Sequence, residues 1–358
     1  MANIFKNFMD NDVTAVRSLL HEAIPVTGSL VSGTYDESTT SSTHVKTFSH
    51  GMFQSVYDYP YMSASSNHLF DITVGVYTGS ALNASITSQA STKANIYSQM
   101  AQVLMGFDAT GSVQQFDEDG ELTSGNKIKE CVFLTFSRLL TKDEIKKGSF
   151  ILEMGVSGNY DTPFVDRVKI LDTGAQNDYR ANSPVGEFGI LYLTNSVGTR
   201  VNGAGSYPCG LLFYQAGVAV ISGSAFSNLL SGSIPFLTSS YDNPVTFADA
   251  LTGSTINTVS NAFRRKFYDL DFNNTTELNS TIYFCRADHN EFNYSSNPTY
   301  TLNGKIRVKN TSTDLPVTYI TTVGLYSPDN ELLALAKLSE PLAKNSSNSL
   351  NIRTRLDF

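Results

Sequence analysis

The side chains of this chain that could carry chemistry are histidines, cysteines and carboxylates, and they are scattered. The five histidines are His21, His44, His50, His68 and His289. None has a second histidine or a carboxylate at the spacing of a metal site on one helix or strand face. His44 and His50 share one polar segment and could chelate an ion, while Asp288 beside His289 could form a catalytic dyad. For His289, a loop histidine that is hydrogen-bonded to the backbone is the commoner alternative.

Motifs for nucleophilic or phosphate chemistry do not occur. There is no G-x-S-x-G elbow and no P-loop. The acidic turn Asp117–Glu121 has glycine at its fourth position, whereas a calcium-binding EF-hand loop needs it at the sixth. Cys131, Cys209 and Cys285 form an odd set without C-x-x-C spacing, which argues against disulfides and zinc. We therefore expect no enzyme activity, no catalytic residues, no metal and no cofactor.

A pair of carboxylates for glycoside hydrolysis stays open, because such a pair needs spatial proximity and leaves no sequence motif. Asp58, Asp71 and Asp269 lie near aromatic residues, although a core or interface role is the simpler interpretation.

The composition of the chain limits the classes of partner that we expect it to bind. Charged residues make up 16% of the 358 residues, against about 25% in an average soluble protein. Low charge suits a surface that is covered by other subunits. A net charge of −8 argues against nucleic-acid binding. No apolar run approaches the ~18 residues that span a membrane, and Met1–Asp12 does not resemble a signal peptide, so we expect a soluble protein made in a cytoplasm.

The spacing of apolar residues predicts a few helices among many strands. Helices are expected over Asn11–Ile24, Thr92–Phe107, Thr141–Gly148 and Phe247–Phe267. Alternating or apolar runs predict strands over Thr27–Tyr35, Leu69–Tyr77, Ile128–Phe136, Phe150–Val156, Phe188–Leu193, Leu211–Tyr214, Val218–Ser222, Thr281–Arg286, Lys305–Lys309, Thr318–Tyr326, Leu332–Leu338 and Leu350–Phe358.

These elements indicate an α+β fold that is predominantly antiparallel β, with a few helices packed on sheets. We divide it into an N-terminal helical arm (1–25), a mainly β domain with helices (26–245), a helical connector (246–272) and a C-terminal β-sandwich-like domain (273–358).

Aromatic residues mark a candidate protein interface. Tyrosine gives large contact area at low entropic cost, although these rings could equally be ordinary core. The candidate residues are Phe48, Phe53, Tyr57, Tyr59, Tyr61, Tyr326 and Phe358. We further expect Met1–Pro25 and Tyr35–Tyr61 to be contact segments that become fully ordered on assembly.

Several segments resemble virion proteins of tailed bacteriophages. One hairpin of such proteins resembles the segment formed by Val317–Tyr326, a turn and Glu331–Leu338. Gly106–Gly111 and Phe136–Gly148 look like parts of structural proteins of T4-like myoviruses, especially marine cyanophages, and Leu211–Val220 looks like another phage hairpin. The resemblance implies a virion component of the tail, baseplate or neck, and it brings no catalytic residues.

We therefore expect a non-enzymatic structural subunit located in the virion and made in the host bacterial cytoplasm. Its partners would be other virion structural proteins, with a homo-oligomer or a symmetric assembly and no nucleic acid or membrane. The alternatives are a carbohydrate- or receptor-binding module of a tail fibre, a capsid decoration protein and a polysaccharide-degrading enzyme.

Overall fold

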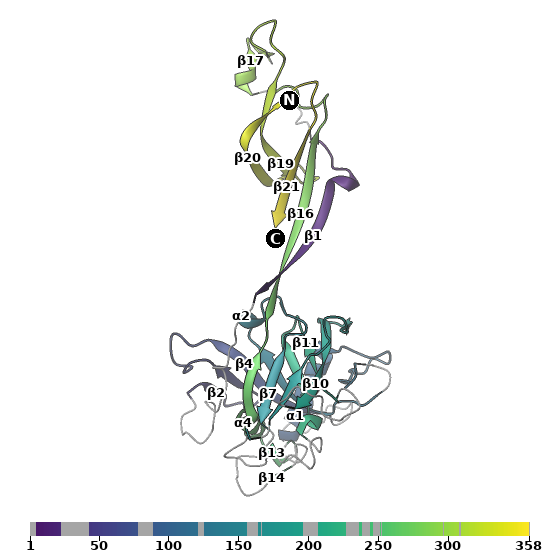
Figure 1. The fold of residues 1–358 in the computed structure, drawn as a ribbon, viewed down its shortest axis with the longest axis vertical. Helices are drawn as coiled ribbons and strands as arrows, with labels where there is room; N and C mark the ends of the chain where they lie inside the picture. Colours follow the sequence, from purple (N-terminus) through teal and green to yellow (C-terminus); the bar gives the residue numbers. More distant parts are fainter. Residues whose placement is uncertain are drawn as a thin grey trace. The chain divides into compact units, whose positions relative to one another are not determined.

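The computed structural model describes most of the chain as two compact units (Figure 1). The smaller unit comprises Met1–Leu19 with Glu277–Phe358, and the larger unit comprises Leu20–Thr276. The residues described are 5–22, 43–77, 89–120, 125–155, 164–165, 167–195, 207–226, 236–237, 244–245, 251, 253–295, 297–307 and 309–357.

The larger unit is built on one antiparallel sheet whose strands run in the order β15-β7-β8-β10-β11-β12-β5-β4-β3-β2, with β9 paired to β10. The strands are β2 (Val45–Thr47), β3 (Gln54–Tyr57), β4 (His68–Val76), β5 (Glu130–Phe136), β7 (Ile151–Gly155), β8 (Arg167–Leu171), β9 (Arg180–Ser183), β10 (Gly186–Asn195), β11 (Tyr207–Phe213), β12 (Val218–Ser222) and β15 (Phe267–Asp271). Two short strands, β13 (Phe236–Leu237) and β14 (Pro244–Val245), pair separately.

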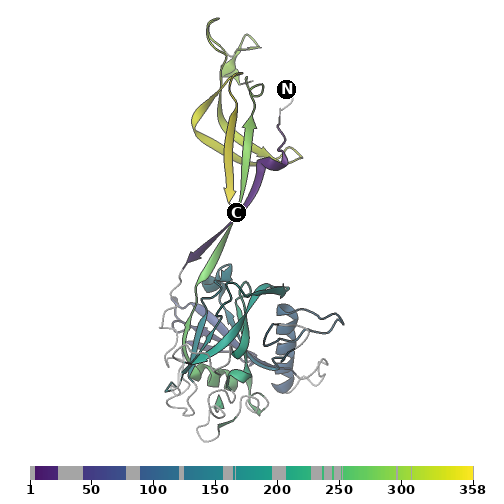
Figure 2. The ribbon, with the colours of Figure 1, turned by 45° about the vertical axis from the view of Figure 1, so that its right-hand side comes forward.

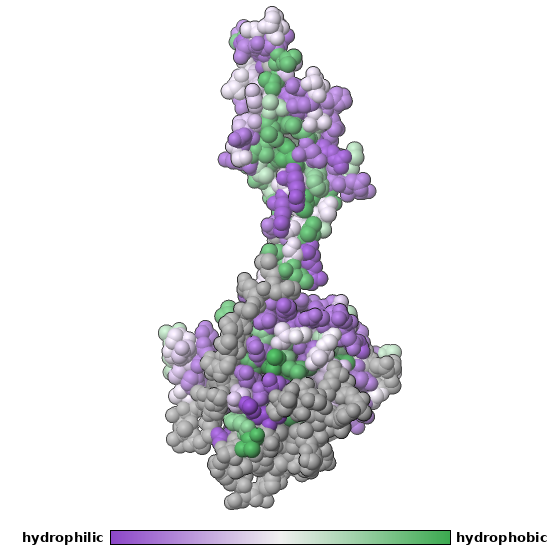
Figure 3. Space-filling model, in the orientation of Figure 1, coloured by the Kyte–Doolittle hydropathy of each residue, from purple (hydrophilic) through white to green (hydrophobic). Residues whose placement is uncertain are grey.

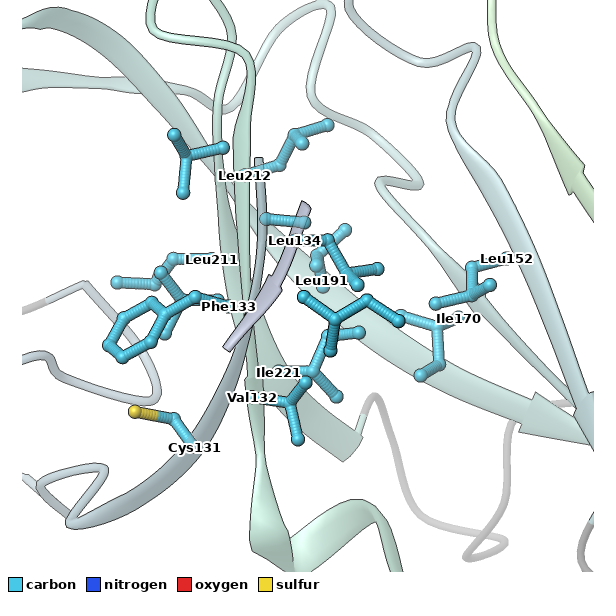
Figure 4. Packing of buried hydrophobic residues seen from close by; sticks show 14 of the residues in the cluster. Cys131, Val132, Phe133, Leu134, Leu152, Ile170, Leu191, Leu211, Leu212 and Ile221 are labelled. Carbon is cyan, nitrogen blue, oxygen red and sulfur yellow. The ribbon is translucent and has the colours of Figure 1, made fainter. Parts of the chain in front are cut away.

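The core of the larger unit lies on its central strands. Four consecutive residues of β5, Cys131–Leu134, are all fully buried, and β12 is buried throughout. Because successive strand residues point to opposite faces, such a run means that both faces of the sheet are covered. Figure 4 shows Val132, Ile221 and Leu191 packed together in this core.

Helix α1 (Gln89–Leu104) packs against β4 at a glycine. A Cβ atom at Gly75 would lie 2.8 Å from Cε2 of Phe133 and 3.0 Å from Cβ of Tyr97, so the missing side chain permits the close approach. The Tyr97 hydroxyl donates to the carbonyl oxygen of Ile128 at 2.6 Å, which satisfies its polar end in the core.

Helix α4 (Ile256–Lys266) also contacts β4. Its N-cap Thr255 accepts a hydrogen bond from the backbone N–H of Thr258 at 3.2 Å. On β3, Gln54 donates to Asn261 at 2.8 Å and accepts from Arg264 at 3.1 Å, which fixes the helix on that strand. Two further helical elements that the structure describes in this unit are α2 (Arg138–Thr141) and the 3₁₀ turn η2 (Gly223–Phe226).

The smaller unit contains three strands of a four-stranded sheet, in the order β1-β16-β21, which Figure 2 shows side by side, and a separate hairpin of β19 with β20. Its elements are η1 (Asp10–Asp12), β1 (Val13–Glu22), β16 (Asn274–Ala287), η3 (Pro298–Tyr300), β17 (Thr301–Leu302), β18 (Lys305–Ile306), β19 (Thr318–Tyr326), β20 (Leu332–Lys344) and β21 (Leu350–Asp357). β16 and β21 pair antiparallel from Ser280↔Asp357 to Ala287↔Leu350.

The predicted fold class is confirmed: the protein is α+β and mostly antiparallel β. The structure also has helices over Gln89–Leu104 and Ile256–Lys266 and a β11–β12 hairpin where the sequence predicts them. The predicted strand Thr27–Tyr35 lies outside the described residues.

Two predicted helices are wrong. In Asn11–Ile24 the structure has strand β1, which pairs with β16 in a sheet. The apolar residues of this segment fit the period of a helix as well as that of a strand, and its pairing with a distant strand makes it a strand. Within Thr141–Gly148 the helix has already ended, because Lys142 has a φ of 51°, and the short strand β6 (Glu144–Ile145) follows and pairs with the start of β16. The N-terminal arm is therefore not helical over Val13–Glu22.

Candidate interaction surfaces

The aromatic segment of the larger unit forms two clusters rather than one. The first occupies the β2–β3 turn, where Phe48 stacks on His50 with centroids 5.2 Å apart and lies 4.8 Å from Phe53. The His50 ring accepts a hydrogen bond at Nδ1 from the backbone N–H of Met52 at 3.1 Å. That ring therefore has a local structural role in the turn.

The second cluster follows β3. Tyr57 lies between Tyr61 and His68, with ring centroids 6.3 Å and 5.4 Å away. Tyr59 and Tyr61 are exposed at 56% and 39%. Asp58 closes this loop by accepting hydrogen bonds from the backbone N–H and the side-chain amide of Asn67 at 2.6 and 2.8 Å. Burial raises the pKa of Asp58, but the bonds from Asn67 outweigh it, so the pKa lies below its usual value.

A serine, a histidine and an aspartate meet beside this second cluster. The Ser55 hydroxyl donates to Asp71 Oδ1 at 2.5 Å, and His68 Nε2 lies 2.8 Å from the same oxygen. In a nucleophilic triad the histidine contacts the serine and the aspartate orients the histidine. Here the carboxylate stands between the other two, so the arrangement holds β3 to β4 and does not activate the serine.

The other residues considered for chemistry make structural contacts in other parts of the molecule. The Asp288 carboxylate pairs with Lys6 at 2.8 Å. Asp117 is buried and pairs with Lys127. Burial raises the pKa of Asp117, and the hydrogen bond from Lys127 opposes that shift. Asp269 lies in β15. Within the described part of the chain, no three His, Cys, Asp or Glu side chains gather as a metal site would require.

In the smaller unit, ion pairs attach the N-terminal segment to the end of β16 and to the loop that follows it. Lys6 Nζ lies 2.8 Å from Asp288 and 2.6 Å from Glu291, and Arg286 Nε lies 2.6 Å from buried Asp12. The hydrogen bonds to these carboxylates raise the pKa of Lys6, and the bond from Lys6 lowers the pKa of both Asp288 and Glu291. Sequence reasoning missed these contacts, since the partners stand 282 and 285 residues apart.

A groove of about 850 Å³ lies beside this N-terminal segment. Its walls include aromatic side chains of the segment, of β16, of β19 and of the connection between them, such as Phe5, Phe8, Phe284, Tyr294, Tyr319 and Tyr326. β19 pairs on one edge with β20, and its other edge has no strand partner within the described residues. Residues along the whole of β19, Thr318–Tyr326, line the groove.

The hairpin itself exposes an apolar face. Tyr326, Leu332, Leu333 and Leu335 are 45%, 51%, 68% and 56% exposed, and we name these four residues the hairpin patch. Figure 3 shows hydrophobic residues of the smaller unit gathered over the region of β19, β20 and β21. Of the predicted interface residues, Tyr326 is therefore on the surface, whereas Phe358 lies outside the described residues.

No described helix is both long enough and apolar enough to cross a membrane. Comparison with known proteins finds no matching family model, no matching curated protein and no matching solved structure.

Proposed function

We propose that the protein is a non-enzymatic structural subunit of a tailed-phage virion, in the tail, baseplate or neck, and that it acts by binding other protein subunits. The resemblance of its hairpins to those of tailed-phage virion proteins supports the class of particle, and so does the resemblance of Gly106–Gly111 and Phe136–Gly148 to parts of T4-like structural proteins. The exposed apolar face of the smaller unit supports the mode of action.

One observation carries the assembly role. Among the described residues of the smaller unit, the buried apolar ones are Ile282, Ala287 and Leu325, while the hairpin patch remains exposed. Isolated soluble proteins rarely leave a contiguous apolar patch of more than a few hundred Å² uncovered, and larger ones mark protein interaction sites. A unit with so little buried apolar surface gains stability by burying more against a partner.

Quantitative mass spectrometry of purified particles tests the proposal. We expect peptides of this chain at a level well below that of the major capsid protein, as for a tail, baseplate or neck component. A level comparable to the major capsid protein would move the chain to the capsid surface. Complete absence from particles would reject the structural role.

The loop with Tyr59 and Tyr61 favours a second function, binding of a carbohydrate receptor. Exposed tyrosine rings beside Asp58 and Asn67 give a stacking surface next to polar groups, which suits a sugar ring. A glycan array probed with the intact chain tests this function. Binding that is lost in Tyr59→Ala and kept in Tyr294→Ala, which removes an equally exposed ring from the smaller unit, would support it. An array on which the chain binds no glycan would refute this second function.

A further inference from the structure

Three of the four residues of the hairpin patch adjoin one another around one glycine. A Cβ atom at Gly324 would lie 2.9 Å from Cε2 of Tyr326 and 3.3 Å from Cδ1 of Leu332. Leu335 is the cross-strand partner of Gly324, and partners on paired strands share a face. Tyr326, Leu332 and Leu335 therefore surround a position without a side chain, and their apolar surfaces adjoin one another.

Over Leu332–Ala336, β20 is apolar on both faces, which is typical of a strand covered on both sides. Ala334, Ala336 and Leu338 are partly buried, whereas Leu333 and Leu335, which alternate with them, are exposed. The strand thus already covers one face within its own unit. The other face presents two leucines that the described residues leave uncovered.

The exposed apolar surface of the hairpin patch is large enough to form part of a protein–protein interface. Four large side chains, each about half exposed or more, offer on the order of several hundred Å². A stable interface buries about 800 Å² on each partner, and its centre is apolar with charges at its rim. The patch has this composition, because its charged neighbours along the strand, Glu331 and Lys337, lie at its two ends.

The order of these charges favours an identical partner. In two-fold packing, each residue i of one copy meets residue j of the other, and j meets i. Two antiparallel copies of β20 would bring Glu331 of each near Lys337 of the other, with the leucines between them. Opposite charges then meet at both ends, and no like charges are forced together.

We propose that the hairpin patch is a self-association surface, on which a second copy of this chain packs its own β20 face. This inference rests on the proposed assembly function and names the first partner. It predicts that the purified chain is an oligomer before any other virion protein is present.

Sedimentation of the full chain over a wide dilution series tests the proposal. Leu333→Thr with Leu335→Thr keeps strand propensity and removes most of the apolar area. Each leucine is more than half exposed, and burying that exposed part strengthens association about tenfold. The double variant removes two leucines from each of the two copies, so it should associate roughly 10,000-fold more weakly. Leu315→Thr, at 78% exposure in a loop of the same unit, is the matched control and should associate as the parent does.

A second measurement does not depend on a variant. Cross-linking an equal mixture of isotope-labelled and unlabelled parent chain through lysines should give hybrid cross-links from Lys337. Three results would overturn the proposal: a monomeric parent chain at all concentrations, equal weakening by Leu315→Thr, or hybrid cross-links from the larger unit only. A chain that oligomerises through the patch yet is absent from virions would refute the proposed function alone, and a monomeric chain found in virions would refute the self-association alone.

Discussion

Replacement of Asp172 by alanine should strongly destabilise the larger unit. This carboxylate is 1% exposed and accepts backbone hydrogen bonds from Gly148 at 2.6 Å and Phe150 at 3.0 Å, and a third from the Tyr214 hydroxyl at 3.2 Å. It thereby connects the end of β8 to the turn that precedes β7.

The magnitude follows from these contacts. A hydrogen bond to a charged group contributes about 1.5–3 kcal/mol. Alanine would leave the buried backbone N–H of Phe150 without its carboxylate partner, and it would also remove the acceptor of Gly148, an exposed residue. Burial raises the pKa of Asp172 in spite of these bonds, which shows that the buried charge is itself unfavourable. Removing that charge therefore offsets part of the stability lost with the hydrogen bonds. The net expectation is a loss of about 3–5 kcal/mol. Tyr214→Phe removes one bond and should cost about 1 kcal/mol.

Urea denaturation followed by far-ultraviolet circular dichroism measures the loss, because the chain has no tryptophan to report by fluorescence. Hydrogen exchange of the β7 and β8 peptides locates it. Asp178→Ala is the control: this aspartate is exposed and paired with Arg180, and such surface pairs contribute up to about 1 kcal/mol. If Asp172→Ala unfolded at the same urea concentration as Asp178→Ala, the reasoning on the buried carboxylate would be refuted.

Two further predictions concern a close contact and an ion pair. Gly210→Ala in β11 should destabilise by about 3 kcal/mol or more, because its Cβ would overlap a backbone carbonyl oxygen of β12, whereas Gly253→Ala has open space and should change thermal stability little. The attachment of Lys6 to Asp288 and Glu291 should persist at neutral pH. It should be lost as the pH falls below about 4, through the lowered pKa values of the two carboxyls. Hydrogen exchange of residues 5–12 would follow that loss, and an exchange rate equal to that of Lys6→Gln at every pH would contradict it.

The local pattern of the chain was enough to predict several elements. The strict alternation of Leu350, Ile352 and Leu356 with polar residues predicts a strand, and β21 occupies Leu350–Asp357. The helical spacing of Ile96, Met100 and Leu104 likewise predicts α1. In both cases the local period is unambiguous and agrees with the burial that the fold imposes.

Local pattern failed where a distant partner decides the conformation. Val13–Glu22 carries apolar residues at helical spacing, yet its pairing with β16 makes it a strand. The contacts of Lys6 with Asp288 and Glu291 have no local signal at all. No pattern within a short window can encode such pairings, because they depend on the path of the whole chain.

The sequence by itself determined the class of fold, the positions of most strands and the lack of recognisable catalytic motifs. It also singled out Tyr326 as an interface candidate. Only the tertiary structure decided which apolar strands are buried: β5 and β20 both read as apolar runs, yet Cys131–Leu134 is fully buried and Leu333 is 68% exposed. The physical reason is that hydrophobicity states what a side chain gains by leaving water, whereas packing neighbours determine whether it has done so.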